Sequence, residues 1–197
     1  MTSTSDSDPT GLQLDAAALK VLAHPLRSRL LSALRRGGPA TATELAGALG
    51  TNTGATSYHL RKLESVGLVT DTGEGAGRRR LWRAATDSHQ WTVSEFAGDR
   101  DSEAALTWLV RDYSHHLGQQ FERWLDVEGS WPGPWRDAAG MSDYFVLVTP
   151  EQAEALKADV DRLVTRYRTA GQGSPDAKRL AVYTVLFPMD LDDPTGR

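Results

Sequence analysis

Hydrophobic residues recur every three or four positions over the first third of the chain, which is the spacing of an amphipathic helix. From Asp15 the pattern runs through Leu19, Leu22, Leu26, Leu30 and Leu34, and Pro25 interrupts it. Proline has no backbone N–H, and it disfavours the helical conformation of the residue before it, here His24. The pattern therefore predicts two helices, the second of which begins at Pro25.

Two short amphipathic segments follow a Gly-Gly-Pro break at residues 37–39. Thr43 is the expected N-cap of the first segment, which Gly50 ends. Asn52 or Thr53 is expected to cap the second, which places Thr56, Leu60 and Leu63 on one face. Because only a few residues around Gly50 join the two segments, the spacing predicts a helix-turn-helix.

Two strand-like runs, within residues 68–85, flank the glycine-rich segment from Gly73 to Gly77. This turn chemistry predicts a β-hairpin after the helix-turn-helix. A nucleotide-binding loop is not favoured, because no helix N-terminus follows the glycines to receive a phosphate.

The second half of the chain predicts a long amphipathic helix from Ser102 to Val127, a loop at 129–135, a strand at 144–149, a helix from Pro150 to about Arg168 and a strand at 179–188. We thus expect an α+β fold, mainly α. Its parts are a disordered tail at 1–11, a winged-helix domain at 12–98, which ends in a polar linker, and a dimerisation domain at 99–197 that could also sense an effector.

Charge is distributed unevenly between the two halves. Residues 12–86 hold 11 Lys and Arg against 5 Asp and Glu, whereas residues 99–197 hold 11 against 17. A basic segment joined to an acidic one is typical of a DNA-contacting module linked to a module with another purpose. The chain has no cysteine, which excludes disulfides and thiolate metal sites. It has neither a signal peptide nor a 20-residue apolar run, so we expect a cytoplasmic protein.

The sequence at 54–69, Gly-Ala-Thr-Ser-Tyr-His-Leu-Arg-Lys-Leu-Glu-Ser-Val-Gly-Leu-Val, resembles the ArsR-type winged-helix repressors. The long C-terminal half resembles the extension found in an actinobacterial branch of that family. The recognition-helix pattern of the family matches at Ser57, His59, Leu60 and Leu63, followed by Gly-Leu-Val at 67–69. A second block that is typical of the family, Ala-His-Pro-Leu-Arg, stands at 23–27. The resemblance covers about residues 14–86 and implies a dimer that binds double-stranded DNA.

On the predicted recognition helix, one exposed stripe holds Thr53, Ser57 and Arg61, and the neighbouring one holds Gly54, Tyr58, Lys62 and Ser65. Both stripes are polar or basic, as base and phosphate contacts require. Alternate arginines of the hairpin should point to opposite faces, so only some would reach DNA, and their alternative role is to protect an edge strand. His59 has two equal alternatives, a DNA contact or a hydrogen bond within the motif. The candidate DNA-binding residues are Asn52, Thr53, Thr56, Ser57, Tyr58, His59, Arg61, Lys62, Arg78, Arg79 and Arg80.

Two groups on the long helix and after it are candidates for other chemistry. Some ArsR-type proteins bind metal ions through Asp and His on this helix, and Asp112 and His116 are four residues apart, near His115 and Glu122. The family's metal patterns do not match, so we expect no metal. Aromatic residues could form a dimer contact or line a pocket for a small apolar effector. These residues are Trp108, Phe121, Trp124, Trp131 and Trp135.

The sequence therefore favours a homodimeric transcriptional regulator that binds a near-palindromic operator, with no cofactor and no enzymatic activity. It leaves open the operator, the effector and the choice between repression and activation. The alternative is a helix-turn-helix docking module that carries a small-molecule-binding or enzymatic C-terminal domain. Neither a catalytic triad motif nor a phosphate loop supports the enzymatic alternative.

Overall fold

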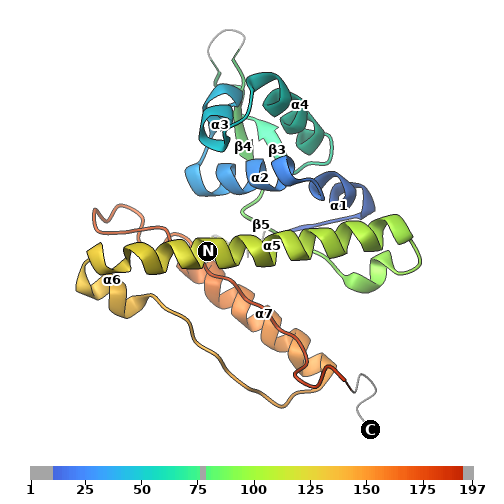
Figure 1. The fold of residues 1–197 in the computed structure, drawn as a ribbon, viewed down its shortest axis with the longest axis vertical. Helices are drawn as coiled ribbons and strands as arrows, with labels where there is room; N and C mark the ends of the chain where they lie inside the picture. Colours follow the sequence, from blue (N-terminus) through green and yellow to red (C-terminus); the bar gives the residue numbers. More distant parts are fainter. Residues whose placement is uncertain (1–10, 76–78, 193–197) are drawn as a thin grey trace, which may run out of the picture. The chain divides into compact units, whose positions relative to one another are not determined.

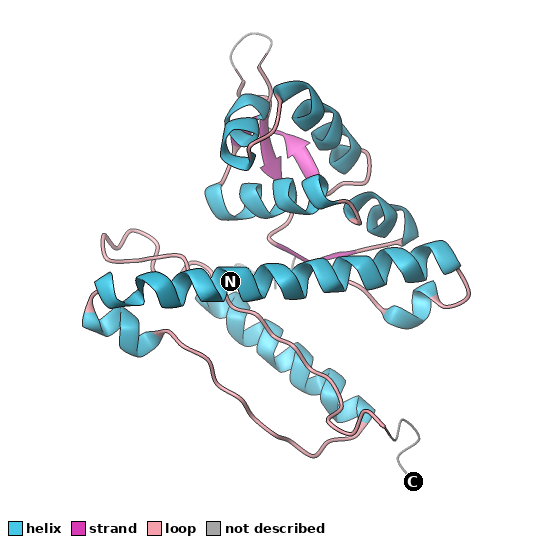
Figure 2. Ribbon diagram, in the orientation of Figure 1, coloured by secondary structure: helices cyan, strands magenta, loops and turns pink. Residues whose placement is uncertain are grey.

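The computed structural model describes residues 11–75 and 79–192. A division after Met141 separates two compact units (Figure 1). Helices dominate both, and the few strands lie in the first unit (Figure 2). This division differs from the expected boundary at 98/99, because the helix that begins at Arg100 contributes Leu106 and Leu109 to the core of the winged helix.

Four helices open the first unit: α1 (Ala16–Leu22), α2 (Pro25–Gly37), α3 (Ala42–Leu49) and α4 (Thr53–Glu64). The Asp15 carboxylate caps α1, where it accepts a hydrogen bond from the Ala18 N–H at 2.7 Å. The predicted break at Pro25 is confirmed, since Pro25 is the first residue of α2. His24 caps this helix, because its Nδ1 accepts a hydrogen bond from the Leu26 N–H at 3.1 Å.

A three-stranded antiparallel sheet completes the winged helix. Its order is β2 (Ala40–Thr41), β4 (Leu81–Ala84), β3 (Val69–Asp71), and Thr70 stands opposite Arg83. The predicted hairpin is therefore confirmed as β3 and β4. Its tip includes residues 76–78, which lie outside the described residues.

A second, parallel pair of strands was not predicted. Strand β1 (Gly11–Gln13) pairs with β5 (Ser88–Gln90), and a 3₁₀ helix, η1 (Val93–Phe96), follows. Phe96 is buried. The expectation of a polar linker up to residue 98 was wrong, because this segment supplies a strand and a core residue. The expected disorder of the tail concerns residues outside the described ones, except for Gly11.

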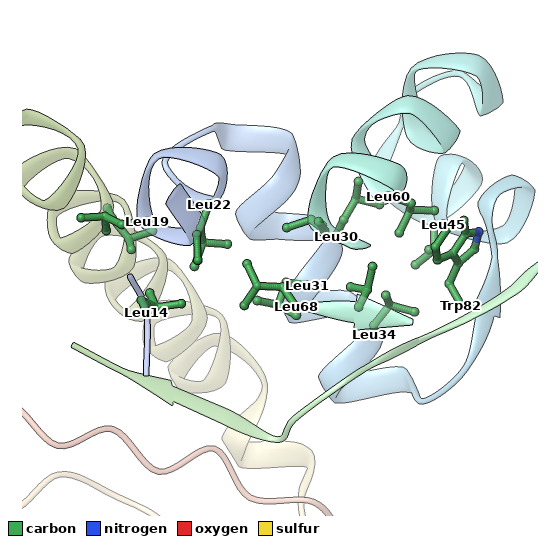
Figure 3. Close-up of a cluster of buried hydrophobic side chains, with 14 of the residues drawn as sticks. Leu14, Leu19, Leu22, Leu30, Leu31, Leu34, Leu45, Leu60, Leu68 and Trp82 are labelled. Atoms are coloured by element: carbon green, nitrogen blue, oxygen red, sulfur yellow. The ribbon is translucent and has the colours of Figure 1, made fainter. Parts of the chain in front are cut away.

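The core of the first unit is built mainly from leucines (Figure 3). Side chains from α1, α2 and α4 meet the inner face of the sheet, where Trp82 is 2% exposed. Burial of such side chains contributes about 1.5 to 3 kcal/mol each. Leu106 and Leu109 extend the same core from the long helix. The helix-turn-helix is thus held on one side by α1 and α2 and on the other by the sheet.

The long helix α5 (Arg100–Val127) confirms the predicted amphipathic helix. Asp99 caps it, since one carboxylate oxygen accepts from the Asp101 N–H and the other accepts from the Ser102 hydroxyl at 2.6 Å. The predicted loop at 129–135 was wrong in part, because a 3₁₀ turn, η2 (Glu128–Ser130), and a short helix, α6 (Gly133–Ala138), occupy most of it. Pro132 is the N-cap residue of α6, and Pro134 is compatible with its first turn.

The second unit, Ser142–Arg197, contains helix α7 (Pro150–Tyr167). A capping box begins it: the Thr149 hydroxyl accepts from the Gln152 N–H, and the Gln152 side chain accepts from the Thr149 N–H at 2.9 Å. The strands expected at 144–149 and 179–188 are absent from this part of the described chain. A strand requires a hydrogen-bonded neighbouring strand, and neither segment belongs to a sheet in the described chain. No helix within residues 11–75 and 79–192 is both long enough and apolar enough to cross a membrane.

Candidate nucleic-acid interface

The turn between α3 and α4 depends on one glycine. Gly50 has φ of 64° and ψ of 40°, the left-handed conformation that glycine adopts without steric cost. Asn52 then caps α4, since its Oδ1 accepts a hydrogen bond from the Ala55 N–H at 2.8 Å. The sequence left Asn52 and Thr53 as alternatives, and the structure selects Asn52. The second helix of the motif therefore starts in a fixed direction.

Helix α4 has a buried face and an outer face. Leu60 and Leu63 are fully buried in the core. Thr56 is also buried, and its hydroxyl donates a hydrogen bond to the Asn52 carbonyl oxygen at 3.0 Å. The structure therefore places Thr56 with the packing residues, in contrast to its prediction as a DNA-binding residue. Spacing alone could have shown this, because Thr56 shares the 56, 60, 63 stripe.

The outer face of α4 borders an open cavity of about 410 Å³. Three elements meet around it: the N-terminal turn of α3, the outer stripe of α4 and the base of the hairpin. The lining residues are Thr41, Ala42, Thr43, Thr53, Ser57, Arg61, Arg79, Arg80 and Trp82. We call the hairpin of β3 and β4 the wing, and this surface the α4–wing face. It brings together five of the predicted DNA-binding residues, and all its charged side chains are arginines.

A second, smaller hollow of about 270 Å³ lies along α4 and is lined by Tyr58, Arg61, Lys62 and Ser65. The Lys62 ammonium is 5.8 Å from the centre of the Tyr58 ring, a cation–π distance. Tyr58 is 54% exposed. Arg61 borders both hollows, so it stands at the centre of the exposed surface of the helix.

The arginines of the hairpin have different surroundings. Arg80 lies 3.6 Å from a Glu64 carboxylate oxygen and 3.4 Å from one of Asp71, and its guanidinium stacks 5.6 Å from the Trp82 ring centre. These contacts tie the hairpin base to the end of α4. Arg79 lines the cavity and is close enough to Glu44 to help lower the pKa of that carboxyl group, though the Thr41 N–H and hydroxyl lower it more. Arg78 lies outside the described residues.

Thr41 was missed as the cap of α3. Its hydroxyl accepts from the Glu44 N–H at 3.3 Å, while a Glu44 oxygen accepts from the Thr41 N–H at 2.7 Å. This capping box begins the helix at Ala42 rather than after Thr43. The signal was present in the sequence, because Thr41-Ala-Thr-Glu44 matches the Ser/Thr-x-x-Glu pattern of a capping box. Thr43 consequently lies in the first turn and lines the cavity.

His59 lies between helices α2 and α4. Its ring centre is 4.5 Å from that of His24 and 5.1 Å from that of Tyr58. Its Nδ1 and the Nε of Arg27 are buried atoms without a hydrogen-bond partner among the described residues. Burial lowers the pKa of both histidines, and the Arg27 charge lowers each further. Because Nδ1 makes no hydrogen bond within the motif, both alternatives for His59, a DNA contact or a hydrogen bond within the motif, stay predictions.

A buried polar network joins the segment after the hairpin to α5. Arg35 Nη1 is 2.6 Å from His89 Nδ1, and Tyr113 Oη is 2.8 Å from His89 Nε2. Arginine can only donate, so Nδ1 accepts and the ring proton lies on Nε2, which donates to the tyrosine oxygen. Burial lowers the pKa of His89 to about 3, and burial also raises the pKa of Tyr113. This network was not predicted, because its three residues are far apart along the chain.

The residues considered for a metal on α5 have other contacts. The Ser28 hydroxyl donates to an Asp112 oxygen at 2.9 Å, and Arg36 Nη1 lies 3.5 Å from His116 Nε2. His115 Nε2 lies 3.0 Å from the Gln119 amide nitrogen. In residues 11–75 and 79–192 no three His, Cys, Asp or Glu side chains cluster as metal ligands would.

The five candidate aromatic residues are spread along α5 and beyond it. Trp108 packs against the core of the winged helix. Trp124, Trp131 and Trp135 form a ladder of edge contacts, with ring centres 5.4 and 6.5 Å apart at interplanar angles of 66° and 77°. Edge-to-face contacts of this kind are favourable for aromatic quadrupoles. The ladder holds η2 and α6 against the end of α5.

Residues 22–72 match the model of a family described as "Helix-turn-helix domain". Over 74 residues the chain is 44% identical to the HTH-type transcriptional regulator NmtR of Mycobacterium tuberculosis (strain ATCC 25618 / H37Rv), a match that covers 38% of this chain. The chain spans 58% of the length of that relative.

A solved structure is also similar: the homodimeric winged helix-turn-helix DNA-binding domain (fragment 1–100) of Mb0332 from Mycobacterium bovis, described as a possible ArsR-family transcriptional regulator. It has 26% identity and a TM-score of 0.32, and the match covers 57% of this chain and 91% of that one. The residues that match the family model, 22–72, contain α2, α3, α4 and strand β3.

Proposed function

We propose that the protein is an ArsR-type transcriptional regulator that binds double-stranded DNA in the cytoplasm as a homodimer. One observation carries the proposal. The α4–wing face joins hydroxyl side chains on α3 and α4 to Arg61 and Arg79 around one open cavity. Short hydroxyl side chains near helix N-termini suit phosphate contacts, and an arginine in the middle of the helix suits a base edge. The similarity to NmtR supports this proposal.

On the α4–wing face and the neighbouring hollow along α4, we assign base reading to Arg61 and Tyr58 and phosphate binding to Thr53, Ser57 and Arg79. Arg61 borders both hollows of α4, and Tyr58 is an exposed large aromatic side chain of that helix. Arg80 contributes less, since the carboxylates of Glu64 and Asp71 already compensate its charge.

The dimer contact that we propose is the second half of α5. Ser102, Leu106 and Leu109 in the first half are buried against the chain's own core. The apolar stripe then continues through Leu117, Phe121 and Leu125 with incomplete cover, and Leu125 is 46% exposed. Gly118 lies beside this stripe, and a Cβ there would meet no atom within 4 Å. A glycine inside a helix destabilises it, but it allows close approach of another helix.

The test begins with a pool of random duplexes, from which the full-length protein selects its sites. A dimer predicts inverted half-sites with centres about 10 bp apart or a multiple of that. On a selected site, Arg61→Ala should lose about 1 to 3 kcal/mol of preference over random DNA. Arg79→Ala should weaken binding to the selected site and to random DNA alike. It should also reduce the slope of the logarithm of the binding constant against the logarithm of the salt concentration, the salt slope, by about 1.

Arg83→Ala is the matched control, because Arg83 is an exposed arginine of the same hairpin that does not line the cavity. Its salt slope should equal that of the wild-type protein. The assignment is wrong if the Arg61 variant keeps full sequence preference while the Arg79 variant loses it. Absence of binding to any duplex at low salt would reject the DNA-binding proposal.

The dimer is tested by sedimentation of Leu125→Glu, with Gln119→Glu as the control on the opposite side of α5. We expect only the first variant to dissociate at micromolar concentration, because it places a charge in the apolar stripe. A wild-type protein that sediments as a monomer would reject the dimer.

A further inference from the structure

The second unit leaves an unusual amount of apolar surface uncovered. Sixteen large apolar side chains between Tyr144 and Leu191 are exposed, among them Phe145 at 73%, Leu147 at 102% and Val185 at 68%. Most belong to two extended segments, residues 144–148 and 180–187, which we call the apolar segments. The rest lie on α7 or follow the second segment.

The area involved exceeds what a monomer in water usually exposes. These sixteen side chains are about 60% exposed on average. A large apolar side chain offers on the order of 150 Å², so together they leave roughly 1,500 Å² uncovered. The largest apolar patch of an ordinary monomer is about 300 to 600 Å². A standard-size protein–protein interface takes about 800 Å² from each partner. The uncovered area is therefore sufficient for a stable interface.

The composition of the apolar segments is that of strands buried on both faces. Both are rich in valine and aromatic residues, and neither contains a charged residue. In the second segment Leu180, Val182 and Leu186 alternate with Tyr183, Val185 and Phe187, so either face is apolar. Free edge strands usually carry lysine, proline or a bulge that prevents pairing. These segments have no such protection.

Helix α7 can cover one face of a sheet made from these segments, and not the other. Its apolar positions, including Leu156, Val160, Leu163 and Tyr167, follow helical spacing along one side. Tyr167 is 69% and Leu163 is 46% exposed, so this side is uncovered as well. A strand–helix–strand unit would therefore leave the second apolar face of its sheet exposed. The edges of its two strands would also be free to pair with strands from elsewhere.

We propose that the apolar segments of two copies of this chain pair with each other as β-strands and form one sheet across the dimer. A second copy presents the same uncharged apolar segments, so the surface is self-complementary under a two-fold axis. The absence of charge gives no basis for recognition of nucleic acid or of an acidic or basic protein. This inference rests on the proposed homodimer, and it adds an interface separate from α5.

The first test is hydrogen exchange of the full-length protein at two concentrations, chosen by sedimentation so that dimer or monomer predominates. We expect the backbone amides of the apolar segments to exchange at least tenfold more slowly in the dimer. Fast exchange at both concentrations overturns the proposal. Slow exchange in the monomer also overturns it, because the segments would then pair within one chain.

The second test compares Val185→Asp with Ala158→Asp in the full-length protein. Ala158 is exposed on the polar side of α7, so both variants add the same charge to the same unit. We expect the dimer dissociation constant to rise at least tenfold for Val185→Asp only. An unchanged dimer dissociation constant for Val185→Asp overturns the proposal. The hydrogen-exchange test uses the wild-type protein, so it holds even if one of these variants fails to fold.

The same preparations separate this inference from the proposed function. Binding of the selected duplex by wild-type protein whose apolar segments remain unprotected would reject the intersubunit sheet alone. Protected segments in a dimer that binds no duplex would reject the regulator and keep the sheet. A dimer that Leu125→Glu dissociates while Val185→Asp does not would leave α5 as the contact and overturn the sheet.

Discussion

The two units of this protein differ in how far their large apolar side chains are buried. In the first, leucines such as Leu60 and Leu63 are 0% exposed, and polar side chains such as Ser28 are hydrogen-bonded. In the second, Leu147 and Leu180 are 102% and 58% exposed. The winged helix therefore has a complete hydrophobic core within one chain. The second unit has the apolar composition of a folded domain, but its large apolar side chains are not packed in a core of that kind.

The largest expected difference in the free energy of unfolding comes from the same Leu→Ala substitution made in each unit. Leu60→Ala should lower the free energy of unfolding by about 2 to 5 kcal/mol, because it leaves a cavity in the core. Leu180→Ala should change it by less than about 0.5 kcal/mol at concentrations where the protein is monomeric. Urea unfolding followed by circular dichroism measures both. Similar losses would show that the second unit has a core of its own.

Removal of one tyrosine hydroxyl should also affect the stability of the two units differently. Tyr113→Phe takes away the oxygen that accepts the His89 Nε2 proton and should cost about 1 to 3 kcal/mol. Tyr167→Phe, at an exposed tyrosine of α7, should be neutral within about 0.5 kcal/mol. Thermal melts of the two variants test this comparison. A neutral Tyr113→Phe would mean that the Arg35–His89–Tyr113 network does not stabilise the fold.

Acid should destabilise the first unit selectively. All five histidines precede residue 117, and burial lowers the pKa values of His24, His59 and His89, the last to about 3. Below the ordinary histidine pKa of about 6.5 the unfolded chain then binds more protons than the folded one. Stability is therefore highest above that pH and falls as pH decreases.

One such histidine changes the free energy of unfolding by up to about 1.4 kcal/mol per pH unit. Urea midpoints between pH 8 and pH 5 measure the slope, and His89→Gln should flatten it. Constant stability over this range would contradict the prediction.

Substitution of helix-cap residues should give the smallest changes in stability, and it compares one cap in each unit. Asn52→Ala should cost about 1 kcal/mol of global stability, because α4 is part of the core of the first unit. Thr149→Ala removes an equivalent cap from α7 and should reduce helix content locally without moving the main unfolding transition. Amide exchange of the two helices distinguishes these outcomes. A shift of the main transition by Thr149→Ala would mean that the two units unfold together.

Elements with a local signal were predicted well. Period, proline and capping residues placed α1, α2, α4, α5 and α7, since each signal acts within about four residues. The glycine-rich tip and its flanking runs predicted the hairpin. The grouping of Thr53, Ser57 and Arg61 on one stripe also followed from spacing alone, and the structure adds that Thr41 and Arg79 border the same cavity.

Features that depend on distant partners were not predicted. The parallel strands β1 and β5 are three residues long, and neither Leu12 nor His89 indicates its partner. The role of Arg80 depends on Glu64 and Asp71, which come from two other elements. The strands expected at 144–149 and 179–188 show the reverse case. Their composition is that of strands, but composition does not supply the neighbouring strand that pairing requires.

The parallel pair of β1 and β5 has a consequence for the order of folding. It closes a loop of about 75 residues, which includes the entire helix-turn-helix and the wing, at an entropic cost of roughly 4 kcal/mol. Three residues of pairing, with the added bond from the Leu14 N–H to the Gln90 carbonyl, cannot offset that cost alone. The strands can meet only after the enclosed core has shortened the distance between them. The two ends of this loop should therefore join last when the chain folds and separate first when it opens.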